Sequence, residues 1–250
     1  MSGSLEHFAP ILQVLERTFR LLERRVPPPK RRVWKDGFVF RCVECTIHQA
    51  IVQKLARIIS GLYAIQTLLE KGLFQEQGVI QRTIDEIQED VIFLSLGIIR
   101  GALTPLHHSY LEYFYAEEFS DPSKVIESHQ SRGMVRRAKI RDYVNQDLGT
   151  DSSRANTSGR VITKAYSGFV HAASPHIMDM YGGMPPQFDV KGESKSYRIE
   201  EHADDALNYF FRALHSMAFA AKAFGDEEMF AELHGRIREL EPKMCPRDFN

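Results

Sequence analysis

The feature that most constrains the fold is a long stretch without proline in which apolar residues recur every three or four positions. It runs from residue 38 to residue 71 and contains Val43, Ile47, Ile51, Leu55, Ile58, Leu62, Ile65 and Leu69. This spacing places one apolar stripe along an α-helix. The stretch therefore predicts a single long helix of roughly 45 to 50 Å, at about 1.5 Å per residue. Gly72 is a suitable residue to end it.

The same spacing elsewhere predicts helices over residues 5–25, 75–103, 110–119, 122–148, 160–175, 198–224 and 226–240. The prolines at 27–29 end the first of these and begin a basic loop. The run VIFLSLGII is apolar on all sides, so its helix should be buried. Residues 149–158 and 182–197 are expected to be loops, because they are rich in small, polar and turn-forming residues. The fold prediction is an all-α helical bundle with a long second helix, a buried central third helix and one long loop.

Length and charge limit the classes of protein further. We expect one domain over residues 1–250, with the helix and basic proline-rich loop of residues 1–37 packed on it. The net charge of −1 gives no overall attraction to nucleic acid or to a membrane, so local patches must supply any such binding. Three cysteines are too few for a disulfide framework, and no apolar run is long enough to span a bilayer. We expect a reduced, cytoplasmic protein without a membrane partner.

Arg100 is the first candidate site residue, because it follows an all-apolar helical run. If the helix continues, His107 lies two turns further along nearly the same face. One interpretation is an arginine and a histidine that act together on a phosphate, since arginine can bind phosphate bidentately and histidine can move protons. The other is a buried arginine paired with a carboxylate on a neighbouring helix.

A second candidate is a helical stripe that contains donors and no acid: Arg160, Lys164, Ser167 and His171. Such a stripe suits an anion, although an ordinary solvated face has the same spacing. Tyr166 lies at its apolar edge. A third candidate is the basic set Arg132, Arg136 and Lys139, which is predicted to share a helix face with Tyr143 and to contact nucleic acid. Basic residues also surround Trp34 in the proline-rich loop.

No complete motif for a cofactor, metal or nucleophile is present, and we expect no cofactor and no metal. Cys42, Cys45 and His48 have the spacing of half a zinc site, with Cys245 as a candidate further ligand. Cysteines buried on a helix are the favoured interpretation. The phosphate-binding P-loop, the dinucleotide-binding glycine motif and the nucleophile elbow of α/β-hydrolases are all missing.

The segment IIRGALTPLHHSYLEYFYAEEF, followed by a basic helix and by Tyr166, Ser167, Val170 and His171, resembles a group of bacterial helical proteins close to the HEPN-like bundles. The resemblance covers about residues 85 to 225. It implies a helical, often dimeric protein, and many HEPN-like proteins resemble metal-independent ribonucleases with an Arg-x4-6-His motif. Arg100 and His107 are the pair that matches this spacing.

Three functional hypotheses follow. The first is binding or cleavage of RNA, or binding of another phosphate ligand, by a protein that can form a homodimer. The second is a non-enzymatic helical adaptor or oligomeric scaffold, which the long second helix favours. The third is a small-molecule binder with a lid at residues 181–195.

Overall fold

The computed structural model describes residues 4–34, 36–119, 126, 132–146, 152–193 and 196–244. Within these residues the α-helices are α1 (Phe8–Glu23), α2 (Ile47–Glu70), α3 (Phe74–Ile99), α4 (Pro105–Tyr115), α5 (Arg137–Asn145), α6 (Ser152–Val170), α7 (Ser174–Met178), α8 (Ile199–Ala223) and α9 (Glu227–Met244). A short 3-10 helix, η1 (Leu5–His7), precedes α1. Two small antiparallel hairpins are formed by β1 (Lys30–Trp34) with β2 (Gly37–Arg41) and by β3 (Tyr181–Gly182) with β4 (Gln187–Phe188). The prediction of an all-α helical bundle is confirmed.

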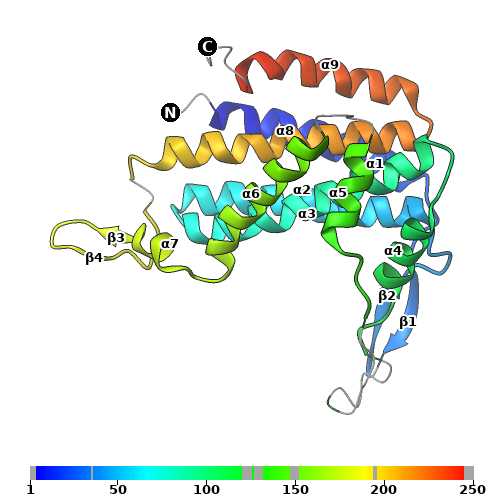
Figure 1. Ribbon diagram of the computed structural model, residues 1–250, viewed down its shortest axis with the longest axis horizontal. Helices are drawn as coiled ribbons and strands as arrows, with labels where there is room; N and C mark the ends of the chain where they lie inside the picture. The colour runs from blue at the N-terminus through cyan, green and yellow to red at the C-terminus, as the bar shows by residue number, and fades with distance from the viewer. Residues whose placement is uncertain are drawn as a thin grey trace.

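The core lies between the long helices α1, α2, α3 and α8, and α9 covers the outer side of α8 (Figure 1). The apolar stripe of α2 is buried as its spacing predicts, from Ile51 to Leu69. Helix α3 is central because α2 and α8 pack on one side of it and α5 and α6 on the other. Helix α6 packs closely against α3 at Gly78, where a Cβ atom would lie 2.6 Å from the ring of Phe169 on α6.

The second helix begins later than predicted, at Ile47 instead of residue 38. Thr46 caps it by accepting a hydrogen bond from the Gln49 backbone N–H, and the Gln49 side chain accepts one from the Thr46 backbone N–H. The preceding residues alternate between two faces of β2, so the predicted basic loop is in fact a β-hairpin. Phe38, Val39 and Phe40 are aromatic and β-branched residues that favour a strand, a short local preference that the longer helical pattern had hidden.

The third helix ends before Arg100, and not near Leu103 as predicted. Gly101 adopts a left-handed backbone with φ of 68°, which breaks the helix, and a separate helix starts at Pro105. The prediction that Arg100 and His107 share one continuous helical face is therefore wrong.

The helix predicted over residues 122–148 is shorter in the part that the structure describes. Residues 132–136 are not helical and α5 starts at Arg137, so Arg132, Arg136 and Lys139 do not share a helix face. The loop predicted over residues 149–158 is also wrong from Ser152 onward, where α6 begins. Lys35, Cys245 and the predicted helix start at residues 121–122 lie outside the described residues.

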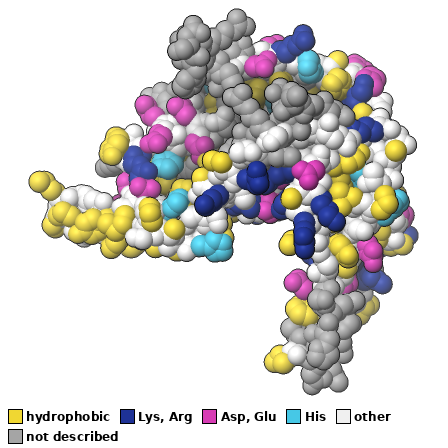
Figure 2. All heavy atoms as spheres, in the orientation of Figure 1, with side chains coloured by type: hydrophobic (Ala, Val, Ile, Leu, Met, Phe, Trp, Pro, Cys, Tyr) yellow, Lys and Arg dark blue, Asp and Glu magenta, His cyan; other side chains and the backbone are white. Residues whose placement is uncertain are grey.

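Two arms project from the bundle (Figure 1). One consists of α7 and the β3–β4 hairpin, and the other of α4 and the β1–β2 hairpin. The surface between the arms is hollowed in Figure 2, and α5 and α6 cross in front of α3 in the view of Figure 1. Among the described residues, no helix has both the length and the apolar character needed to cross a membrane.

Candidate functional site

Helix α5 is held against α3 by two arginines one turn apart that point inward. Arg137 donates to Asp90 at 2.5 Å and to Glu89 at 2.9 Å, and Arg141 donates to Glu89 at 2.7 Å. Arg141 also donates to the Thr163 hydroxyl on α6 at 2.6 Å. Because residues four apart share a helix face, both guanidinium groups can reach the carboxylates of α3 together. These contacts fix α5 and α6 side by side on α3.

Asp90 joins three further elements at this point. The Lys54 ammonium of α2 donates to its second oxygen at 2.8 Å, and both side chains are nearly buried. Burial lowers the pKa of Lys54, which Asp90 partly offsets. Burial also raises the pKa of Tyr110 on α4, and the neighbouring Asp90 carboxylate raises it further. Asp90 is therefore the hub that ties α2, α4 and α5 to α3.

Four other basic side chains, on α5, at its N-cap and on α6, are exposed. We call the exposed residues Arg136, Lys139, Arg160 and Lys164 the outer basic face. Figure 2 shows Lys and Arg side chains gathered over these two helices. Helix α6 contains no Asp or Glu and α5 contains only Asp142. In the described part of the chain, no carboxylate forms an ion pair with any of the four.

The predicted stripe on α6 is turned away from the residues that contact α5. Thr163 faces Arg141, and the stripe residues lie about 40 to 100° further around the helix. Arg160, Lys164 and His171 are exposed, and Ser167 is half-buried. The Arg160 guanidinium donates to Thr157 at 3.2 Å, one turn earlier.

Tyr166 points away from the stripe, into the bundle. Its hydroxyl donates to Asp205 on α8, which also accepts a hydrogen bond of 3.1 Å from Gln81 on α3. Burial raises the pKa of Tyr166, and nearby Tyr209 and Asp205 raise it further. The structure therefore does not bring Tyr166 to the anion-binding surface predicted around it; this side chain instead connects α6 to α3 and α8.

Arg100 and His107 both contact the aromatic ring of Tyr143. The Arg100 guanidinium lies 4.6 Å from the ring centroid of Tyr143 and donates to its carbonyl at 3.2 Å. The ring of His107 packs edge-on against the same tyrosine at 4.7 Å and stacks on Phe93 at 4.1 Å.

His107 is fully buried and both of its ring nitrogens are occupied. Nδ1 accepts from the Thr104 hydroxyl at 2.8 Å and from the Thr104 backbone N–H at 3.2 Å, so Nε2 carries the proton and donates to the Phe93 carbonyl. Burial lowers the pKa of His107, which keeps the ring neutral. The catalytic assignment stays a prediction, but these contacts favour a packing role, because a substrate phosphate would have to replace them.

Other predicted residues are spread over the molecule. Arg132 donates to the Tyr113 carbonyl at 2.8 Å, which ties the segment before α5 to α4. Cys42 is half-buried and Cys45 exposed, both ahead of α2, so the prediction of cysteines buried on a helix is wrong. His48 packs edge-on against Phe224 at 4.7 Å. No cluster of three or more metal-binding side chains occurs in the described ranges.

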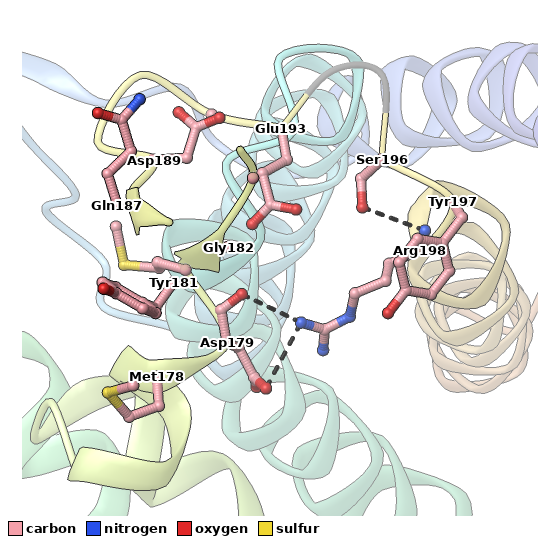
Figure 3. Close-up of a pocket in the computed structure, with 13 residues that line it drawn as sticks. Met178, Asp179, Tyr181, Gly182, Gln187, Asp189, Glu193, Ser196, Tyr197 and Arg198 are labelled. Atoms are coloured by element: carbon pink, nitrogen blue, oxygen red, sulfur yellow. Dashed lines mark hydrogen bonds and ion pairs between the residues drawn. The ribbon is translucent and has the colours of Figure 1, made fainter. Parts of the chain in front are cut away.

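A hollow with a volume of about 630 Å³ lies beside the β3–β4 hairpin (Figure 3). Arg198, at the start of α8, reaches across it to Asp179, donating to the carbonyl at 3.3 Å and lying 3.4 Å from the carboxylate. Asp189 and Glu193 also line the hollow. The segment predicted as a lid thus forms one wall of a real hollow, and its role as a lid stays a prediction.

No model of a known protein family, no characterised protein and no solved structure matches this chain. The sequence prediction missed Arg137 and Arg141, the two arginines that position the outer basic face. Their spacing of four residues was visible, but their acidic partners on α3 lie about 50 residues earlier in the chain.

Proposed function

We propose that this chain binds RNA through the outer basic face formed by α5 and α6. The observation that carries the proposal is the separation of charges on these helices. The inward arginines occupy the carboxylates of α3, whereas the outward cations meet no carboxylate among the described residues. A polyanion can therefore approach this face without competing with internal ion pairs, although the chain as a whole has a net charge of −1.

The two rigid helices give this face a defined spacing of cations, and the resemblance to HEPN-like proteins implies the same class of ligand. Arg136 and Arg160 can hold phosphate oxygens bidentately, and the lysines act as point charges. The proposal concerns binding and not cleavage, since His107 is buried and fully hydrogen-bonded.

The test is the salt dependence of RNA binding, measured by fluorescence anisotropy with a labelled 20-nucleotide RNA. Each phosphate that the protein neutralises contributes a slope of about −0.7 to −0.9 to log K against log salt. The double variant Lys139→Gln/Lys164→Gln should lose affinity and reduce the magnitude of the slope by about 1.5.

The matched control is Arg236→Gln/Arg238→Gln, which removes two exposed cations from α9 on another side of the bundle. It should leave both affinity and slope close to wild type. If the two double variants behave alike, or if the wild type does not bind RNA, the proposal is wrong.

The hollow beside the β3–β4 hairpin supports a second candidate function, the binding of a small cationic molecule. Arg198 is paired with Asp179, and Asp189 and Glu193 on the wall have no ion-pair partner in the part of the chain that the structure describes. Spermidine should raise the melting temperature of the wild type, and Glu193→Gln should weaken this effect. An equal shift in both proteins would mean that spermidine binds elsewhere.

A further inference from the structure

The β1–β2 hairpin has one face that the bundle leaves uncovered. In its register Arg31 pairs with Phe40 and Val33 with Phe38, so these four side chains share a face. Val33 is 88% exposed, Phe40 59% and Phe38 47%. Clustered exposed aromatic side chains on a projecting hairpin contribute nothing to the core, and such patches usually mark a binding surface. We call Arg31, Val33, Phe38 and Phe40 the hairpin platform.

One ring of the platform carries a cation. Phe38 and Phe40 pack edge to face with centroids 5.5 Å apart, and the Arg31 guanidinium lies over the Phe38 ring, 3.8 Å from its centroid. The guanidinium therefore covers one face of Phe38 and adds a positive charge beside the aromatic side chains.

The opposite face of the hairpin anchors it. Arg41 holds Glu117 with two hydrogen bonds of 2.6 and 3.0 Å, and its guanidinium lies 5.8 Å from the Trp34 ring. The pairing of Arg41 with Glu117 fixes which face of the hairpin turns outward. The platform is therefore presented in a defined orientation.

The platform is connected with the outer basic face through the end of α4. Glu117 binds the hairpin, and one turn earlier the Tyr113 carbonyl accepts from Arg132, just ahead of α5. Gly133 lies directly against Tyr113, since a Cβ there would be 2.3 Å from its ring. The hairpin and the segment that leads into α5 are thus fixed to the same few residues of the chain after and within α4. The outer basic face begins at Arg136, four residues after Arg132, so one extended ligand can contact both surfaces.

We propose that Phe38 and Phe40 stack on unpaired bases, so that the RNA bound by this protein is single-stranded. An exposed aromatic ring can stack on an unpaired base, whereas the bases of a duplex are already stacked on their neighbours. Stacking of this kind accepts any of the four bases. The surrounding charge favours a nucleic acid over a protein partner: residues 24–41 contain seven Lys or Arg and one acid, Asp36. This inference rests on the proposed function, because the backbone of the same strand would lie on the outer basic face.

The experiment compares a 12-nucleotide oligouridine with an abasic ribose-phosphate oligomer of the same length, which offers the backbone without bases. For the wild type, oligouridine should bind about tenfold or more tightly than the abasic oligomer, since stacking of two bases provides the difference. In the variant Phe38→Leu/Phe40→Leu, which keeps the face apolar, this preference should disappear while abasic binding stays unchanged. The control Val43→Ala alters an exposed apolar residue between the hairpin and α2 and should keep the preference.

The outcomes separate the two proposals. Equal binding of both oligomers by the wild type overturns the platform but leaves backbone binding on α5 and α6 intact, and no binding of either oligomer overturns both. If the leucine variant keeps the preference, the bases stack elsewhere and the platform is wrong. If it instead changes the sedimentation of the RNA-free protein, the platform docks a second copy of this chain and not RNA.

Discussion

The strongest stability prediction concerns Asp90, which accepts from Lys54 and Arg137 inside the bundle. The substitution Asp90→Asn keeps the size of the side chain and removes one negative charge. The Lys54 side chain is only 11% exposed, and Asp90 is its one ion-pair partner in the described part of the chain. Arg137 keeps Glu89, so most of the cost falls on Lys54.

The magnitude follows from leaving a buried charge without its partner. Such changes cost about 3 to 5 kcal/mol, because the ammonium has lost its hydration and its counter-ion together. With a urea m-value of about 3 kcal/mol/M, the midpoint of unfolding should fall by about 1 M or more. The double variant Lys54→Met/Asp90→Asn should recover at least about 1 kcal/mol relative to the sum of the single variants.

Urea unfolding followed by far-ultraviolet circular dichroism measures these differences. The control is Glu23→Gln, which breaks a pair with Arg20 whose side chains are 44% and 65% exposed. It should cost less than about 1 kcal/mol. A loss below 1 kcal/mol for Asp90→Asn, or strict additivity with Lys54→Met, would refute the assignment of Asp90 as a charged hub.

Three other changes test separate parts of the fold. Burial lowers the pKa of His48, His107 and His202 in the folded state, so below about pH 6.5 the unfolded chain binds protons that the folded chain does not. The urea midpoint of unfolding should therefore fall as the pH drops from 7.5 to 5.5. The variant His202→Phe should show a weaker dependence of the midpoint on pH. Tyr166→Phe removes the hydrogen bond to Asp205 and should cost about 1.5 to 3 kcal/mol by urea unfolding, whereas Tyr197→Phe, at an exposed position, should cost nothing measurable. Gly97→Ala places a Cβ 2.6 Å from Nε2 of His107 and should lower stability by about 1 to 3 kcal/mol, and unchanged stability would show that the ring can move aside.

The helical core could be predicted from the sequence because its signal is repeated over many turns. The apolar positions of α2 from Ile51 to Leu69 are buried as the spacing indicates. The errors lie where a short local preference competes with that spacing. The five residues of β2 form a strand where a helix was predicted, and Gly101 ends α3 earlier than predicted. Both features are too short to interrupt the helical spacing of the apolar residues around them.

The polar interior of α3 was harder to foresee. Its buried side chains Gln77, Gln81, Asp85 and Gln88 face α8, where they bind the His202 carbonyl, Asp205, Arg212 and the Tyr209 carbonyl. Each partner lies more than 120 residues away in the sequence. Spacing within one helix indicates that a face is polar, but not whether solvent or another helix covers it.

At the candidate RNA site, too, the sequence did not reveal which charged side chains face solvent and which face another helix. The sequence prediction grouped Arg132, Arg136 and Lys139 by charge, but the fold separates the basic residues of this region by geometry. Arg137 and Arg141 point inward, where a planar guanidinium can bridge two carboxylates on α3, and Lys139 lies between them on the opposite side of α5. The inward pair gives α5 its position, and that position determines which cations remain outside. Binding of a polyanion by this face would therefore depend on internal ion pairs that never touch it.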